Sequence, residues 1–225
     1  MSSWSLLLPR DIRNQISSYL DQYNKYYPVI NYKKYLIKYV AKYFDTDKEL
    51  KYLTNLQHLD SLSNKNFTDK GLGYLTNLQH LNCGSNKNFT DKGLGYLTNL
   101  QHLNCRYNIN FTDEGLKHLT NLQVLYCMYN DNFTDEGIKQ LSNLHELKCG
   151  WNTNFTDEGL KHLINLQQLD CMYNNNFTDK GLCYFTNLRE LNCEENLNFT
   201  DEGLKHLTNL QVLNCGWNTD RKSVV

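Results

Sequence analysis

The chain has 225 residues, of which 40% are hydrophobic and 21% are charged, so it holds enough apolar material for one folded domain with an appendage. Its formal net charge of −1 excludes the strong basic excess that is typical of general nucleic-acid binders. No apolar run approaches the roughly 18 residues that a membrane-spanning helix needs. The start, residues 1–10, also lacks the apolar stretch of a secretory signal. We therefore expect a soluble protein whose partners include neither nucleic acid nor a membrane.

Residues 1–44 form a segment of distinct composition. It is basic, with seven Lys or Arg residues against two Asp residues. Pro9 is well placed to open a helix, and the apolar spacing predicts that this helix runs from Asp11 to about Leu20. After a break around Pro28, a second amphipathic helix is expected over residues 30–44.

Residues 45–220 consist of one repeated unit. The string Phe-Thr-Asp-(Lys/Glu)-Gly-(Leu/Ile) begins at Phe67 and returns every 22 residues up to Phe199, and a degenerate copy starts at Asp45. Each unit also carries Leu-x-x-Leu-x-Cys-x-x-Asn, as in Leu78 to Asn86. This pattern resembles the leucine-rich repeat. The resemblance implies an α/β fold, a leucine-rich-repeat solenoid of eight units with a curved parallel sheet inside and short helical or 3₁₀ segments outside, followed by a tail at residues 221–225.

The residues of one unit predict its local structure. Leu81 and Cys83 alternate with polar residues, as in a short strand with one buried face. Thr68 is a helix-start residue, and Gly71 is expected to mark a tight, 3₁₀-like turn. The Asn that ends each strand, as in Asn86, should hydrogen-bond the turns of neighbouring units.

The cysteines indicate a cellular compartment. Seven of the eight occupy one phase of the repeat, from Cys83 to Cys215, where an odd-numbered column of equivalent sites has no natural disulfide pairing. Free buried thiols favour a reducing interior. Seven Asn-Phe-Thr sequons, beginning at Asn66, would place glycans beside a buried Phe in a secreted chain. We expect a cytoplasmic or nuclear protein.

The sequence offers little that could carry out chemistry. Most polar residues recur identically in every unit, whereas a catalytic site needs different residues at one point. We therefore expect no enzyme, no cofactor and no metal. A stack of His58, His80 and His102 on adjacent strands could bind a metal or sense pH, or it could be a plain surface ladder.

The units differ from one another mainly at the strand positions that point outward. Val124 is expected at one of these outward positions. Several of these outward positions carry Tyr, Trp, Met or Arg, which are residue types enriched in interface hot spots. One interpretation is a partner-binding patch; the other is that the aromatic row merely covers the rim of the sheet. The residues of the predicted patch are Arg106, Tyr126, Met128, Tyr129, Trp151, Met172 and Tyr173.

The N-terminal motif Leu8-Pro9-Arg10-Asp11-Ile12, followed by Ile16 and Tyr19-Leu20, resembles the start of an F-box. F-box/leucine-rich-repeat proteins are substrate receptors of SCF-type ubiquitin ligases, in which the F-box docks on a Skp-type adaptor protein and the repeats hold a protein substrate. The resemblance implies that the adaptor is contacted by Leu8, Pro9, Ile12, Ile16 and Leu20. Such a receptor does no chemistry itself and raises the local concentration of the substrate near the ubiquitin-transferring enzyme.

The resemblance covers residues 8–20, and the Trp-containing second half of an F-box has no counterpart, since no Trp occurs between Trp4 and Trp151. Two other hypotheses remain open: residues 1–44 act only as a cap, and the repeats form a binding module with no ubiquitin role. The Asn-, Lys- and Tyr-rich units are similar to those of F-box/leucine-rich-repeat proteins of giant DNA viruses and amoebae. A viral source would imply the host cytoplasm.

Overall fold

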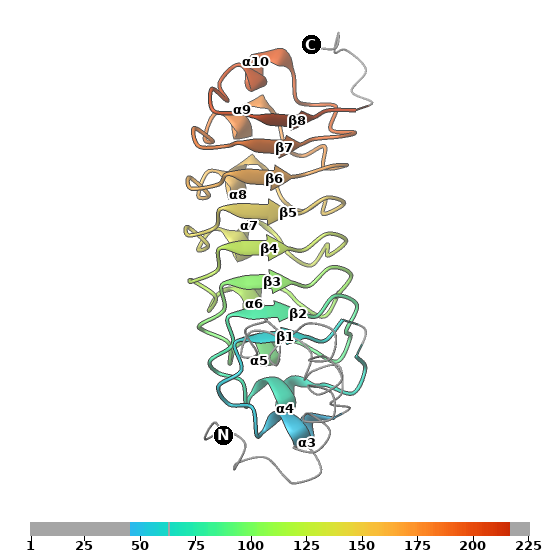
Figure 1. The fold of residues 1–225 in the computed structure, drawn as a ribbon. Coiled ribbons are helices and arrows are strands. Elements are labelled where there is room, and N and C mark those ends of the chain that lie inside the picture. The colour runs from blue at the N-terminus through green and yellow to red at the C-terminus, as the bar shows by residue number, and fades with distance from the viewer. Residues whose placement is uncertain (1–45, 63, 217–225) are drawn as a thin grey trace, which may run out of the picture.

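A computed structural model describes residues 46–62 and 64–216. In Figure 1 the strands lie one above another in sequence order, and a short helix lies behind the sheet in each unit. The sheet has eight parallel strands in the order β1 to β8. The predicted α/β solenoid is therefore confirmed. The predicted helices of residues 1–44 and the tail at 221–225 lie outside the described residues.

Each unit contributes one helix of four residues and one strand of three residues. The helices are α3 (Asp47–Leu50), α4 (Asp69–Leu72), α5 (Asp91–Leu94), α6 (Asp113–Leu116), α7 (Asp135–Ile138), α8 (Asp157–Leu160), α9 (Asp179–Leu182) and α10 (Asp201–Leu204). The strands are β1 (His58–Asp60), β2 (His80–Asn82), β3 (His102–Asn104), β4 (Val124–Tyr126), β5 (Glu146–Lys148), β6 (Gln168–Asp170), β7 (Glu190–Asn192) and β8 (Val212–Asn214).

Strand register follows the repeat without a shift. Leu59 pairs with Leu81, and Leu81 pairs with Leu103, so residues 22 positions apart are neighbours throughout the sheet. Because side chains alternate along a strand, the central Leu of each strand points into the core. Equivalent Phe and Leu side chains of successive units form continuous buried columns, of which Phe111 and Leu125 are fully buried members.

An Asp–Thr contact links each helix to the next unit. In α5, Asp91 accepts two hydrogen bonds from Thr112, one from its backbone N–H (2.8 Å) and one from its hydroxyl (2.6 Å). The same hydroxyl of Thr112 caps α6 by accepting from the backbone N–H of Glu114, as the Thr signal predicted. The recurring Thr-Asp pair therefore acts as a clasp between units as well as a helix start.

The clasp also explains the recurring Gly of the motif. A Cβ atom on Gly115 would lie 2.5 Å from Oδ1 of Asp91 and 2.9 Å from a methyl group of Leu94. The sequence predicted a tight-turn role for Gly71, and the backbone N–H of Gly71 does bond the carbonyl of Thr68 at 2.9 Å. The stronger reason for glycine is the close approach of the preceding unit, not backbone freedom.

The strand-end Asn residues form a buried ladder, as predicted. The side chain of Asn130 donates to the carbonyl of Asn108 (2.8 Å) and accepts from the backbone N–H of Asn132 (3.1 Å). In turn, Asn152 donates to the carbonyl of Asn130 at 2.6 Å. These bonds satisfy turn groups that would otherwise be buried without partners.

The cysteine column is buried and free of disulfides within the described residues. Cys83, Cys105, Cys127, Cys149, Cys171 and Cys193 are buried, whereas Cys215 is partly exposed and Cys183 lies on the surface. Burial raises the pKa of the Cys127 thiol, and neighbouring cysteines of the column raise it further. The raised pKa favours the protonated form of the buried Cys127 thiol, which is a weak nucleophile. No helix among the described residues is long and apolar enough to cross a membrane.

Candidate functional site

The strand face is defined here as the outward side chains of β1–β8 together with the turn residues that follow each strand. Every unit places its outward positions beside those of the next, because the strands pair in register. The units differ in sequence at many of these positions, so this face can distinguish one part of the solenoid from another. Val124, which the sequence places at an outward position, lies in register between His102 and Glu146 and is only 5% exposed.

Four aromatic residues on this face form a continuous stack, called the aromatic ladder: Tyr107, Tyr129, Trp151 and Tyr173. Successive ring centroids are 4.5, 4.7 and 4.6 Å apart, a spacing set by that of neighbouring strands. The inner rings cover one another's faces, so a partner meets mainly ring edges. Tyr129, Trp151 and Tyr173 of the predicted patch are thus brought together, and Tyr107 extends the row.

The backbone of the ladder has an uncommon conformation. Each ladder residue has a positive φ, for example 57° at Trp151, and so do Ser85 (60°) and Glu195 (58°) at the same position of other units. A positive φ is uncommon in residues other than glycine. Because Ser85 and Glu195 share the conformation, it belongs to the repeat and does not require an aromatic side chain.

A polar cluster adjoins the ladder at β4 and β5. The hydroxyl of Tyr126 donates to Oε1 of Glu146 at 2.7 Å. The ammonium of Lys148 lies 3.3 Å from the same carboxylate and 4.6 Å from the centroid of the Tyr126 ring. Partial burial and the bond to Glu146 raise the pKa of Tyr126. Tyr126 therefore remains a neutral hydrogen-bond donor that is fixed in place.

The two methionines and Arg106 of the predicted patch occupy one row of the strand face, at the second position after each strand. Met172 lies over Gly150, since a Cβ atom on Gly150 would be 2.7 Å from Cγ of Met172. The side-chain amide of Asn192 lies 3.9 Å from the Met172 sulfur. Met128 is half-buried, and Arg106 is exposed. The seven predicted residues thus form one surface of adjacent units.

The predicted histidine stack is present at the other end of the sheet. The rings of His58 and His80 are 3.9 Å apart, and those of His80 and His102 are 4.0 Å apart. Burial lowers the pKa of His102, and the nearby His145 lowers it further, while Glu146 opposes the shift. Among residues 46–62 and 64–216, no group of three or more His, Cys, Asp or Glu residues is arranged to hold a metal ion.

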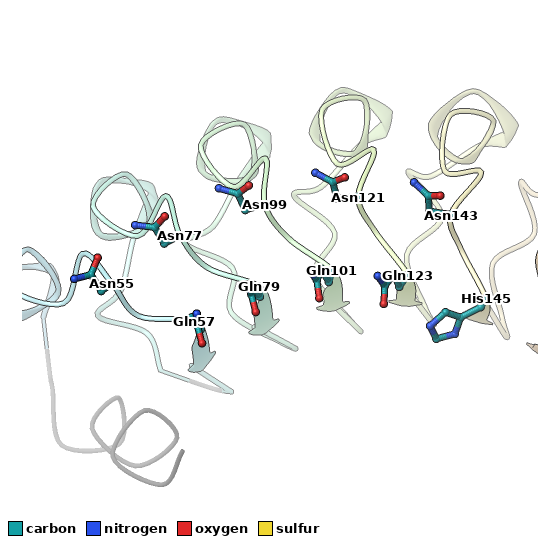
Figure 2. Close-up of a pocket in the computed structure, with 10 residues that line it drawn as sticks. All are labelled: Asn55, Gln57, Asn77, Gln79, Asn99, Gln101, Asn121, Gln123, Asn143 and His145. Atoms are coloured by element: carbon teal, nitrogen blue, oxygen red, sulfur yellow. The ribbon is translucent and has the colours of Figure 1, made fainter. Parts of the chain in front are cut away.

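A polar groove runs along the solenoid beside the strands, and the sequence analysis missed it. Figure 2 shows one row of Asn side chains near the helices and a parallel row that is Gln at every unit until His145. The first stretch of the groove has a volume of about 960 Å³, and a second of about 620 Å³ continues from Asn143 to Gln211. The signal in the sequence is the recurring Asn-Leu-Gln triplet, as in Asn77 to Gln79.

The Asn row of the groove is structural. The side chain of Asn99 donates to the carbonyl of Thr76 at 3.0 Å, and that of Asn121 donates to the carbonyl of Thr98 at 3.1 Å. The groove therefore offers mainly amide side chains for hydrogen bonding, together with His145 and Arg189. The predicted adaptor contacts Leu8, Pro9, Ile12, Ile16 and Leu20 lie outside the described residues.

Comparison with known proteins supports the fold. The sequence matches no protein-family model and no curated protein. Among solved structures, internalin C2 (inlC2) of Listeria monocytogenes is 28% identical with a TM-score of 0.59, and the match covers 74% of each chain. The internalin inlF of the same organism is 23% identical with a TM-score of 0.59 over 75% of this chain. TLR13, in the TLR13–ssRNA13 complex, is 23% identical with a TM-score of 0.60 over 76% of this chain.

The chain spans 57% of the inlF structure and 26% of the TLR13 structure. The arrangement of parallel strands and short helices is thus that of a known architecture. The chain therefore has the fold of a leucine-rich-repeat solenoid, similar to that of the two internalins.

Proposed function

We propose that this protein is a non-enzymatic recognition module that binds a protein partner on its strand face, around the aromatic ladder. The observation that carries the proposal is the ladder itself, four stacked aromatic rings on a face whose side chains differ from unit to unit. Aromatic side chains and Met supply large contact areas at interfaces. Tyr107 is 50% exposed although it is large and hydrophobic.

The polar residues that recur in every unit support a scaffold rather than an enzyme. The Asp–Thr clasps and the Asn ladder engage them in bonds between units. Cys127 and Cys149 of the column are buried, and burial raises the pKa of both thiols, which disfavours the nucleophilic thiolate.

A photoreactive phenylalanine analogue tests the binding surface. It replaces Tyr107 on the strand face in one variant and Tyr96, which is 40% exposed on the helix side, in the other. In a eukaryotic cell extract, we expect a defined cross-linked product from the first position only, and its yield should fall when Trp151→Ser is added. Equal products from both positions, or a product that Trp151→Ser leaves unchanged, would contradict the proposal.

The finer proposal is that the protein is a substrate receptor of an SCF-type ubiquitin ligase. The specific observation that favours it is the Leu8-Pro9 to Tyr19-Leu20 motif ahead of the repeats. A Skp-type adaptor would bind residues 8–20, while the strand face would hold a protein substrate.

A binding assay between the full chain and a purified Skp-type adaptor tests this. Leu8→Asp and Pro9→Ala should abolish binding, whereas the strand-face variant Tyr126→Ala should bind as the natural chain does. If the natural chain does not bind the adaptor, residues 1–44 act as a cap and the ubiquitin role is withdrawn. The protein-binding proposal does not depend on that outcome.

We further propose a cytoplasmic or nuclear location, in the host if the chain is viral. In the six sequons from Asn88 to Asn198, the Asn side chain donates to a carbonyl of the preceding unit. In one of them, the Asn110 side chain donates to the carbonyl of Lys87 (2.5 Å), Phe111 is fully buried and the hydroxyl of Thr112 donates to Asp91. A glycan on that amide would remove its bond to the neighbouring unit. Fluorescence microscopy of a tagged chain in the source cell tests the location, and a secreted, glycosylated product would refute it.

A further inference from the structure

We infer that the strand face from β5 to β8 docks a cationic, extended protein segment, which places apolar side chains on Trp151 and Met172 and Lys or Arg side chains against the carboxylates beyond them. This inference rests on the proposed function, because it names the chemistry of the partner at the same face. It is carried by an apolar platform, by a set of carboxylates that have no cationic partner in the part of the chain that the structure describes, and by the way the two adjoin.

The apolar platform lies at the junction of β5 and β6. Trp151 stacks between Tyr129 and Tyr173, with centroid distances of 4.7 and 4.6 Å. Met172 lies flat over Gly150, where no side chain lifts it away from the sheet. Ring edges and a thioether form a surface that adapts to apolar groups of different shape.

Carboxylates cover the strand face beyond this platform. Over β6–β8 the outward positions carry Asp170, Glu190, Glu194 and Glu195 and no Lys or Arg. Within the described residues, none of these four forms an ion pair. Their hydrogen bonds come instead from neutral donors, such as the side chain of Gln168 to Glu190 (3.3 Å) and that of Asn214 to Glu194 (3.4 Å).

The helix side of the molecule shows the opposite arrangement. Glu114 pairs with Lys117, Glu136 with Lys139, and Glu202 with Lys205, each three residues apart on a helical turn. On the strand face, Glu146 is likewise paired with Lys148. Among residues 46–62 and 64–216, the carboxylates of β6–β8 therefore stand out because no Lys or Arg pairs with them, and such a surface attracts and orients a partner of positive charge.

The platform and the carboxylates meet at the end of the aromatic ladder. The ladder stops at Tyr173, and the equivalent position of the next unit carries Glu195 with the same backbone conformation (φ of 58° at both). A guanidinium or ammonium group placed against Tyr173 would contact an aromatic ring and a carboxylate together. An anionic ligand such as single-stranded RNA would meet four negative charges here, which disfavours it.

Fluorescence anisotropy with the full chain tests the inference. The probe is a labelled synthetic peptide in which Lys and Leu alternate with Gly and Ser. A peptide with Glu in place of Lys and a labelled single-stranded RNA are the comparison probes. We expect the Lys peptide alone to bind, with an affinity that falls about tenfold or more as salt rises, because exposed charges are screened.

Variants locate the binding. Trp151→Ser places at that position the residue that the chain itself carries at Ser85, so the backbone conformation is retained. We expect a loss of about tenfold in affinity from it, and a loss of about three- to tenfold from the double variant Glu194→Gln/Glu195→Gln. The matched control is Glu136→Gln/Glu202→Gln on the helix side, which should change affinity less than about twofold.

The inference is overturned if the Lys peptide binds no better than the Glu peptide, if RNA binds instead, or if the helix-side control weakens binding as much as the strand-face variants do. The proposed function is still supported after any of these outcomes if the photoreactive analogue at position 107 gives a cross-linked product whose yield depends on Trp151. If that product is also independent of Trp151, the proposed function fails with it.

Discussion

The clasp between units makes a strong prediction at Gly115. In Gly115→Ala, the new Cβ would lie 2.5 Å from Oδ1 of Asp91, so that carboxylate must move. Its bonds from Thr112 would then break or lengthen from 2.8 and 2.6 Å. A hydrogen bond to a charged group contributes roughly 1.5–3 kcal/mol. We therefore expect a loss of about 2–4 kcal/mol in the free energy of unfolding.

The neighbouring Gly95 provides a matched control. A Cβ atom there meets nothing closer than 3.5 Å, and its backbone has φ of −59°. Other units carry Lys at this position with the same geometry, as at Lys117. Gly95→Ala should therefore be neutral or stabilise the fold by about 0.4–1 kcal/mol, since it reduces the freedom of the unfolded chain.

Urea unfolding, followed by far-UV circular dichroism, measures both variants. A double-mutant cycle then isolates the contact: in an Asp91→Ala background, Gly115→Ala should cost clearly less than it does alone, because the clashing carboxylate is gone. If Gly115→Ala is as harmless as Gly95→Ala, or if the cycle shows no coupling, the steric reading of the motif is refuted.

Three further predictions address the core, the Asn ladder and the histidine stack. Leu125→Ala removes a fully buried side chain and should cost about 2–5 kcal/mol by urea unfolding; a loss below about 1 kcal/mol would contradict the core assignment. Asn130→Asp keeps the shape but cannot donate to the carbonyl of Asn108, so at neutral pH it should cost about 1–3 kcal/mol, and equal stability would refute the role of the ladder. The pKa of His102 is lowered in the folded state, so its neutral form contributes stability that is present above the unfolded pKa near 6.5 and lost as pH falls through the folded value. When the pH is lowered from 7 to 5, the Tm of His102→Gln should therefore fall by less than the Tm of the natural chain. His206→Gln, which changes an exposed residue on the helix side, should show the same fall in Tm as the natural chain.

The sequence predicts the solenoid because the repeat length and the hydrophobic pattern within each repeat indicate the same fold. The 22-residue spacing sets the unit, and the alternation around Leu81 sets which side of the strand is buried. Thr68 as helix start and the strand-end Asn ladder follow from side-chain hydrogen bonding and are confirmed. These features are local or repeat identically, so one unit contains the information for all.

Features that depend on contacts between units were harder to predict. The close approach of Asp91 to Gly115 joins residues 24 positions apart, and a tight turn explained the glycine equally well from sequence alone. The burial of Val124 depends on which side chains flank it in the neighbouring strands. The groove beside the strands arises from two rows of amides that are unremarkable within a single unit.

The Asp–Thr clasp also bears on how such an array changes in length. Each carboxylate serves the unit that follows it, so every joint is chemically the same and has a direction along the chain. Insertion or deletion of a whole 22-residue segment would leave each joint with its proper donor and acceptor, whereas a segment of another length would separate them. The number of units can thus vary freely during evolution, and the position of a binding surface can be moved along the array without redesign of the interior.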